Sequence, residues 1–278
     1  MSPAASDAQT SGPVAAQPAA LAPLKSKTLA TLSGIIHGFF GRAGGVSQAP
    51  FDSLNTGFGA DDERANVLEN RARCARFLGA EPDRLLTVHQ IHSPGVVTVD
   101  RPWLGDPPEA DGLVTSRPGL ALGALAADCM PYLFVDPQAH IIGAAHAGWP
   151  GALAGVLEAT VEAMTGLGAE PARIHAALGP CLRQPNFEVG LDLVARFEEK
   201  FGAEKIMPFF APGRAPHKRQ FDLAGFGRAR LRAVGVRHLD DLDVCTRAQH
   251  GTFFSYRHSR QTGQRDYGRN LSAIMLTG

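Results

Sequence analysis

The sequence predicts one domain of the mixed α/β class, and two observations carry that prediction. Short apolar runs bounded by glycine and proline alternate with segments of helical periodicity through residues 85–201. After residue 25, nothing in the composition marks an internal linker. A chain of 278 residues could form one large domain or two small ones, and either would bury an ample core.

The N-terminal segment differs from the rest of the chain. Residues 1–25 consist mainly of Ala, Pro, Ser and Gln, with few large apolar side chains. Such a composition cannot offset the entropy lost on ordering by burying apolar surface. We expect a disordered extension at residues 1–25 and the folded domain at residues 26–278.

Residues 61–78 predict a helix. The first residues are acidic, which suits the positive end of the helix dipole, and Gly79 ends the segment. The apolar side chains recur at helical spacing, at Val67, Leu68, Ala72, Ala75 and Leu78.

The remaining elements follow from short apolar runs and turn residues. Strands are predicted at 85–99, 119–127, 132–135, 141–145 and 174–178. Pro150 occupies a favoured first position of a helix, and residues 189–201 predict another helix. A last pair, at 252–257 and 270–276, predicts antiparallel strands joined by a polar loop.

Charge and cysteine content exclude several classes of protein. Lys and Arg together number 27, as do Asp and Glu, so the chain lacks the basic footprint that nucleic-acid binding needs. The four cysteines lie far apart without a CxxC pair, which suits neither a disulfide framework nor a zinc ribbon. No signal peptide or membrane span is evident. We expect a cytoplasmic monomer that binds neither nucleic acid nor a membrane.

Three side chains at the ends of apolar runs indicate a metal site. His92, Cys129 and His146 offer two imidazoles and one thiol. A His/Cys/His set leaves the fourth place of a tetrahedral zinc ion open, as catalytic zinc sites do. Within a strand at 85–99, His89 and His92 would face opposite sides, so only one of them can be a ligand.

Seven blocks in register resemble one known family, the YfiH-like family, which is also labelled the polyphenol oxidase or laccase-domain family. The blocks lie at residues 37–47, 53–57, 90–93, 110–115, 128–131, 146–149 and 254–257. The resemblance implies one compact α+β unit with mixed sheets, of the cysteine-hydrolase type. It also selects His92, directly after Gln90 and Ile91, as the metal-binding histidine.

The resemblance extends to the remaining site residues. Cys129 and His146 are expected to be both metal ligands and catalytic, while Asp128 could carry a proton or orient a ligand histidine. Arg42 stands beside Gly44 and Gly45, and such a turn can present a guanidinium to phosphate or cap a hairpin at the surface. The other family-block residues, Asn55, Asp111 and Arg257, could contact substrate or stabilise turns.

The resemblance implies a zinc-dependent purine nucleoside enzyme, with nucleoside and phosphate as its substrates. The reactions would be phosphorolysis of adenosine, inosine, guanosine or 5′-methylthioadenosine, and hydrolytic deamination of adenosine. The enzyme would therefore be both a glycosyltransferase and a hydrolase.

Three alternatives remain open. A Cys/His hydrolase could use Cys129 as nucleophile and His146 as base, as an amidase that edits peptidoglycan precursors. A binding module without catalysis could use a metal only to fix the fold. A copper-dependent polyphenol oxidase is disfavoured, although copper could replace zinc, because the sequence has no His-x-His pair and no histidine beside Cys129.

Overall fold

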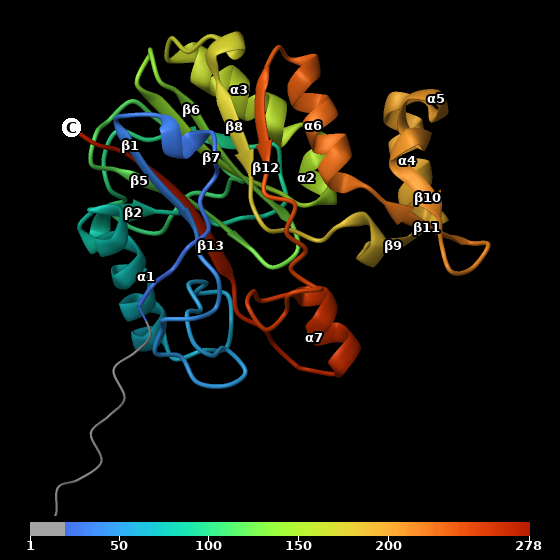
Figure 1. The fold of residues 1–278 in the computed structure, drawn as a ribbon, viewed down its shortest axis with the longest axis horizontal. Helices are drawn as coiled ribbons and strands as arrows, with labels where there is room; N and C mark the ends of the chain where they lie inside the picture. The colour runs from blue at the N-terminus through green and yellow to red at the C-terminus, as the bar shows by residue number, and fades with distance from the viewer. Residues whose placement is uncertain (1–19) are drawn as a thin grey trace, which may run out of the picture.

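The computed structural model describes residues 20–278, which form one compact domain of mixed α/β class, as predicted (Figure 1). Most of the predicted N-terminal extension lies outside the described residues. Within them, Leu24 and Phe39 exchange two backbone hydrogen bonds of 2.9 Å each, and Leu21 packs on the core. The part of residues 1–25 that the structure describes therefore packs on the domain.

The larger of two main sheets has six strands. Their order across the sheet is β12 (His238–Asp241), β8 (His175–Leu178), β6 (Met130–Asp136), β7 (Ile141–Ala147), β4 (Gly112–Thr115) and β3 (Val96–Thr98). The pairs β3–β4 and β8–β12 are parallel and the others antiparallel, so the sheet is mixed.

The second main sheet has four strands and carries the chain's last strand. Its order is β1 (Ile35–Phe39), β13 (Asn270–Leu276), β5 (Ala121–Ala126) and β2 (Leu85–Leu86). A small third sheet is formed by β10 (Phe210–Pro212), β11 (Lys218–Phe221) and β9 (Glu188–Gly190).

The two main sheets face each other, with helices on their outer faces (Figure 1). Along β13, Leu271 and Ala273 pack beneath α1 (Arg64–Leu78), whereas Ile274 packs against the six-stranded sheet. Along β6, Leu133 faces the four-stranded sheet, and Phe134 faces the helices. This alternation is the period of a strand buried on both faces, and it accounts for the nearly continuous apolar runs.

The remaining helices cover the six-stranded sheet and its ends. They are α2 (Trp149–Ala154), α3 (Val156–Gly166), α4 (Leu191–Phe201), α5 (Ala203–Ile206), α6 (Leu223–Ala233) and α7 (Tyr256–Thr262). The helix predicted after Pro150 is divided into α2 and α3, because Gly155 adopts φ +110° between them.

The prediction of one strand over residues 85–99 is wrong. Its first residues form β2 in the four-stranded sheet, whereas Val96–Thr98 form β3 in the six-stranded sheet. Residues 87–95 cross between the sheets and bond to the 108–111 loop, with the His89 amide donating to Pro108 and the Ala110 amide donating to His89. The apolar content of residues 85–99 could not show that the segment is divided between two sheets.

The predicted strand at 252–257 is also wrong, because this segment leads into α7. The Ser255 hydroxyl accepts a hydrogen bond from the His258 amide, an N-cap contact that begins the helix. The strand at 270–276 exists as β13, but its partners are β1 and β5. The other predicted helices and strands are present, with ends shifted by a few residues.

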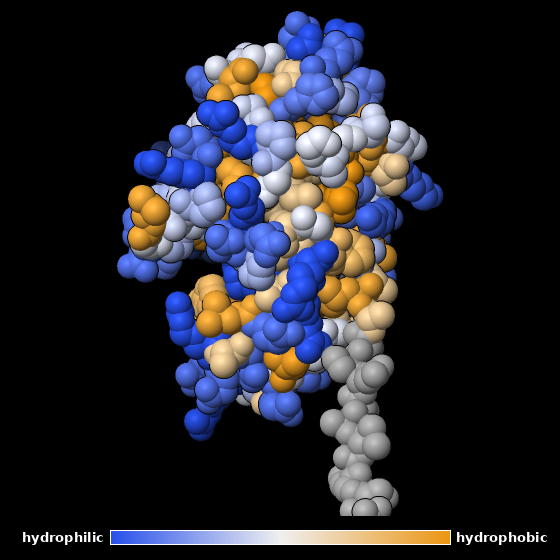
Figure 2. Space-filling model, turned by 90° about the vertical axis from the view of Figure 1, so that its left-hand side faces the viewer, coloured by the Kyte–Doolittle hydropathy of each residue, from blue (hydrophilic) through white to orange (hydrophobic). Residues whose placement is uncertain are grey.

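No helix within residues 20–278 is long and apolar enough to cross a membrane. On the face that Figure 2 shows, polar side chains are interspersed with apolar ones, and the apolar ones gather on the right-hand side of the view.

Candidate metal centre and adjoining cavity

Two crossings between the main sheets bring the candidate ligands together. His92 lies in the 87–95 crossing, and Cys129 lies between β5 of one sheet and β6 of the other. His146 lies on β7, opposite Pro131 of β6. One ligand atom from each of the three side chains lies within 4.8 Å of the other two. The Cys129 Sγ atom is 3.7 Å from Nε2 of His92, and the two imidazole rings meet edge to face.

Asp111 lies behind this cluster and holds two parts of it. Its Oδ1 atom is 2.8 Å from Nδ1 of His146. Its Oδ2 atom accepts hydrogen bonds from the amides of Ile91 and Ser93, at 3.2 and 2.6 Å, on either side of His92. The carboxylate is 1% exposed and does not line the adjoining cavity, so Asp111 holds an orienting position behind the candidate ligands.

The backbone around the cluster is unusually constrained. His92 adopts φ +60° and Asp128 φ +96°, conformations that L-residues rarely occupy. Gly148 lets its backbone lie close to two of the candidate ligands. A Cβ atom there would lie 2.4 Å from Cδ2 of His92 and 2.9 Å from Sγ of Cys129. The cluster therefore requires glycine at position 148.

The cluster residues shift one another's pKa values. Burial alone would raise the pKa of the Cys129 thiol, but the charge and hydrogen bonds of His146, with those of His92, lower it to about 6. Burial alone would lower the pKa of His146, but Cys129 and Asp111 raise it to about 9. The geometry thus favours a thiolate beside an imidazolium when no cation lies between them.

Asp128 adjoins Cys129 in sequence but is directed elsewhere. Its Oδ1 accepts a hydrogen bond from the Thr246 hydroxyl, and its Oδ2 from the Arg257 amide, both at 2.6 Å. Burial raises the pKa of the Asp128 carboxyl despite these bonds. Asp128 is not a member of the ligand cluster, but it lines the cavity beside it.

A cavity of about 660 Å³ opens next to the cluster, and all three candidate ligands line it. His89 also lines the cavity without joining the ligand set. Of the proposed substrate-binding residues, Arg257 lines the wall.

Several further residues complete the cavity wall; of these, Trp149 and Tyr256 lie in the blocks at 146–149 and 254–257 but were given no role from the sequence. The aromatic part of the wall includes Phe58, Trp149, Phe187, Tyr256 and Tyr267, and Arg269 provides a second guanidinium. Tyr267 and Arg269 fall in no recognised block, and only the pairing of β13 in the four-stranded sheet brings them to the cavity.

Arg42 and Asn55 do not line the cavity. The Arg42 guanidinium is 3.0 Å from the Asp52 carboxylate, donates to the His250 carbonyl, and lies over the Phe254 ring. These contacts hold the Arg42 guanidinium in its own loop, away from the cavity.

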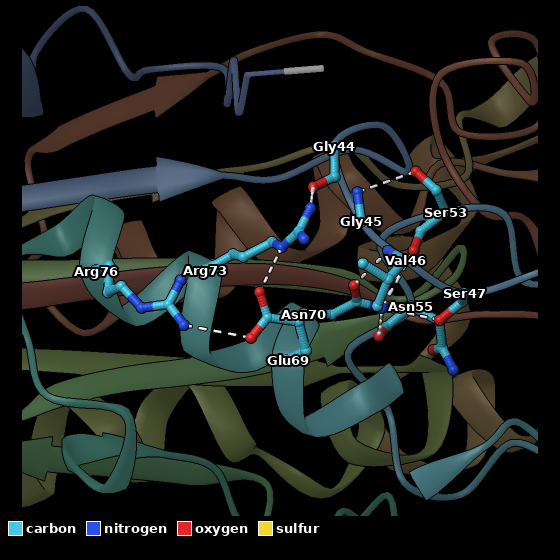
Figure 3. A network of polar contacts seen from close by, with 10 residues as sticks. All are labelled: Gly44, Gly45, Val46, Ser47, Ser53, Asn55, Glu69, Asn70, Arg73 and Arg76. Carbon is cyan, nitrogen blue, oxygen red and sulfur yellow. Dashed lines mark hydrogen bonds and ion pairs between the residues drawn. The ribbon is translucent and has the colours of Figure 1, made fainter. Parts of the chain in front are cut away.

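Asn55 is fully buried, and its side chain forms hydrogen bonds with backbone amides. Its Oδ1 accepts hydrogen bonds from the amides of Gly57 and Arg269, and its carbonyl accepts one from Asn70 (Figure 3). Asn70 also bonds to Ser53 in the same network, which joins α1 to the 44–55 loop. Asn55 therefore positions Arg269 and does not reach the cavity itself.

The donor set fits a single metal ion. Three ligands with an open fourth place suit a catalytic zinc site, and Asp111 supplies the carboxylate that often orients a ligand histidine. Within residues 20–278 this is the one group of three or more such side chains that could hold an ion.

Comparison with known proteins gives a family match and several relatives of this chain. Residues 36–277 match the family model described as multi-copper polyphenol oxidoreductase laccase. A purine nucleoside phosphorylase of Streptomyces griseus is 42% identical over 238 residues, which cover 84% of this chain and 94% of that protein. A purine nucleoside phosphorylase of Deinococcus radiodurans is 43% identical over 230 residues, covering 82% and 86% of the two chains.

Solved structures are also similar to this chain in sequence and fold. A Neisseria meningitidis protein is 33% identical with a TM-score of 0.78, covering 88% of this chain and 96% of that one. The YfiH protein of Bacillus licheniformis is 28% identical with a TM-score of 0.80, covering 87% and 93%. With a family match over most of its length and relatives of this similarity, the chain belongs to the YfiH, or laccase-domain, family.

Proposed function

We propose that this protein is a zinc-dependent purine nucleoside enzyme that catalyses phosphorolysis of purine nucleosides and hydrolytic deamination of adenosine. The observation that carries the proposal is the His92, Cys129 and His146 cluster, which opens into a cavity lined by aromatic and arginine side chains. Relatives that are 42% and 43% identical to it over the aligned residues are named purine nucleoside phosphorylases, which supports an enzyme acting on nucleoside and phosphate.

The candidate ligands would hold one zinc ion. When bound, zinc supplies a Lewis-acid charge that favours ionisation of water near neutral pH, as deamination needs. The Asp111 carboxylate keeps His146 in the orientation that presents Nε2 to the cluster, because Nδ1 faces Asp111. Gly148 leaves room for His92 and Cys129 to approach each other.

The cavity wall offers groups for the nucleoside. The rings of Tyr256 and Tyr267 lie 5.2 Å apart and provide flat apolar surface for a purine base. Asp128 is the buried carboxyl group in the wall, and its raised pKa favours a form that can exchange a proton with the base. We assign Asp128 the role of proton carrier on this ground.

Zinc is favoured over copper by the ligands available. A multicopper centre needs many histidines in paired patterns, whereas no His-x-His pair occurs in the sequence. A blue-copper site would add a methionine on the axis of a His₂Cys set. Met130 follows Cys129, but it packs in the core against α6 near Gly227.

A cysteine hydrolase is the second candidate, and one observation favours it. The lowered pKa of Cys129, the adjacent His146 and the 2.8 Å contact of His146 with Asp111 reproduce the nucleophile, base and orienting group of cysteine hydrolases. An amidase acting on peptidoglycan precursors would use Cys129 as nucleophile and His146 as base.

Metal analysis combined with a nucleoside panel separates these functions. Purified protein should contain close to one zinc per chain, and it should release base from nucleosides only when phosphate is added. Cys129→Ala should lose the zinc, whereas Cys245→Ala, a half-buried thiol outside the cluster, should retain it. Full zinc content in Cys129→Ala, or no turnover of any purine nucleoside by zinc-loaded protein, would refute the proposal.

A further inference from the structure

Two arginines line the cavity, and within residues 20–278 neither forms an ion pair with a carboxylate. Arg257 is the second residue of α7, and Arg269 immediately precedes β13. Within residues 20–278, neither guanidinium lies within 4.0 Å of an Asp or Glu carboxylate, in contrast to Arg42 and its partner Asp52. The cavity therefore contains two positive charges that no described acidic side chain neutralises by direct contact.

Both guanidinium groups are held in place. Nη1 of Arg257 donates to the carbonyls of Asn186 and Glu188, at 3.4 and 3.2 Å, and the group lies 5.6 Å from the Phe187 ring centre. The Arg269 guanidinium lies 3.8 Å from the Tyr267 ring centre and donates through Nη1 to the Tyr267 carbonyl. Because residues 20–278 engage only Nη1 of each guanidinium, Nε and Nη2 can still donate to a ligand.

The surroundings favour an anion over a second cation. The carboxyl group in the same wall is Asp128, and both its oxygens already accept hydrogen bonds. The rings of Tyr256 and Tyr267 connect the two arginine-bearing segments at 5.2 Å. A guanidinium group whose orientation is already fixed suits the oxygens of a phosphate group, because the arginine side chain loses little conformational freedom on binding.

We propose that Arg257 and Arg269 form the phosphate subsite of the cavity and bind inorganic phosphate as co-substrate; this rests on the proposed phosphorolysis. A phosphate oxygen forms a bond to C1′ of the ribose, and the bond between C1′ and the base nitrogen breaks. The electron pair leaves with the purine, which takes up a proton. The step needs no oxidant or reductant.

The zinc-loaded enzyme tests the subsite through Arg257→Gln and Arg269→Gln, which lie on separate segments and are assayed separately. Each should raise the KM for phosphate about tenfold or more, the effect of losing a charged hydrogen bond. Deamination of adenosine, which uses no phosphate, should change far less. Arg269→Lys should recover part of the phosphate affinity. Arg265→Gln removes an exposed charge from the same loop outside the cavity and should match the parent enzyme.

Calorimetric titration of the same proteins with inorganic phosphate, without nucleoside, separates the subsite from the proposed function. Phosphate binding that weakens in both Gln variants supports the subsite even if no nucleoside is turned over. An unchanged phosphate KM in both variants of an active phosphorylase overturns the subsite and leaves the function intact. Weaker binding of a purine nucleoside 5′-monophosphate with unaltered phosphate binding would assign the arginines to a phosphomonoester and also overturn the proposal.

Discussion

The Asp111 carboxylate lies 2.8 Å from Nδ1 of His146 and, with its other oxygen, accepts the Ser93 amide at 2.6 Å. One buried side chain thus fixes the imidazole of one candidate ligand and the backbone next to another, His92. Burial opposes ionisation of Asp111, but the bonds from His146 and Ser93 hold the pKa of its carboxyl below the ordinary value. Asp111 is therefore a carboxylate at neutral pH.

Asp111→Asn should weaken zinc binding roughly 10- to 100-fold, the effect of losing the orienting partner of a ligand histidine. The amide cannot accept from both His146 and Ser93 as the carboxylate does. Competition with a chelator measures the affinity. Asp136→Asn is the matched control, because Asp136 is another fully buried carboxylate that bonds to loop amides and lies outside the cluster. Equal zinc affinity in the two variants would contradict the orienting role.

Gly148→Ala should disturb the ligand cluster itself. The new methyl group would meet Cδ2 of His92 at 2.4 Å and Sγ of Cys129 at 2.9 Å, so one of them must move. We expect sharply lower zinc content and a stability loss of about 1–3 kcal/mol from overpacking. Gly166→Ala, at a helical position with open space around it, should leave zinc content unaltered. Normal zinc content in Gly148→Ala would show that the cluster tolerates a wider spacing.

Arg42→Gln tests whether this arginine has a structural role only. The substitution removes the ion pair with Asp52 and the contact with the Phe254 ring. Both are partly exposed, so thermal unfolding should show a loss of about 1 kcal/mol. The KM for phosphate should stay at the parent value. A rise matching that of Arg269→Gln would return Arg42 to the phosphate site.

The fold class and the positions of most elements follow from apolar runs and turn residues, but the path of the chain between sheets does not. Periodicity treats residues 85–99 as one strand, and under that assumption His89 and His92 could be separated only by family resemblance. In the structure the segment leaves one sheet and enters the other, and His92 lies in the crossing with positive φ. The local pattern carries no information about which sheet accepts each half.

The residue that orients His146 could likewise not be identified from the local sequence. Asp128 adjoins Cys129 in sequence, which suggests that it could orient a ligand histidine, yet its carboxylate bonds to Thr246 and to the Arg257 amide. Asp111 lies 35 residues from His146 and reaches it through the antiparallel pairing of β4 with β7. Arg269 likewise reaches the cavity only through long-range pairing of β13.

The reactivity of Cys129 should depend on zinc. In metal-free protein its pKa of about 6 makes the thiolate abundant at pH 7, and the thiolate fraction falls as the pH falls through that value. Iodoacetamide should therefore modify Cys129 rapidly at pH 7 after chelation, and more slowly below pH 6. Bound zinc should protect the thiolate. Mass spectrometry of the labelled peptides measures both rates, and labelling of Cys245 should not respond to zinc. Equal labelling of Cys129 with and without zinc would place the ion elsewhere.

Phosphorolysis of a purine nucleoside by chelated protein, before and after zinc is restored, tests most directly whether the cluster works as a metal centre. Activity should disappear on chelation and return with zinc, and iodoacetamide should have little effect on the zinc-loaded enzyme. If chelated protein keeps full activity and iodoacetamide abolishes it, Cys129 acts as a nucleophile and the zinc mechanism is wrong.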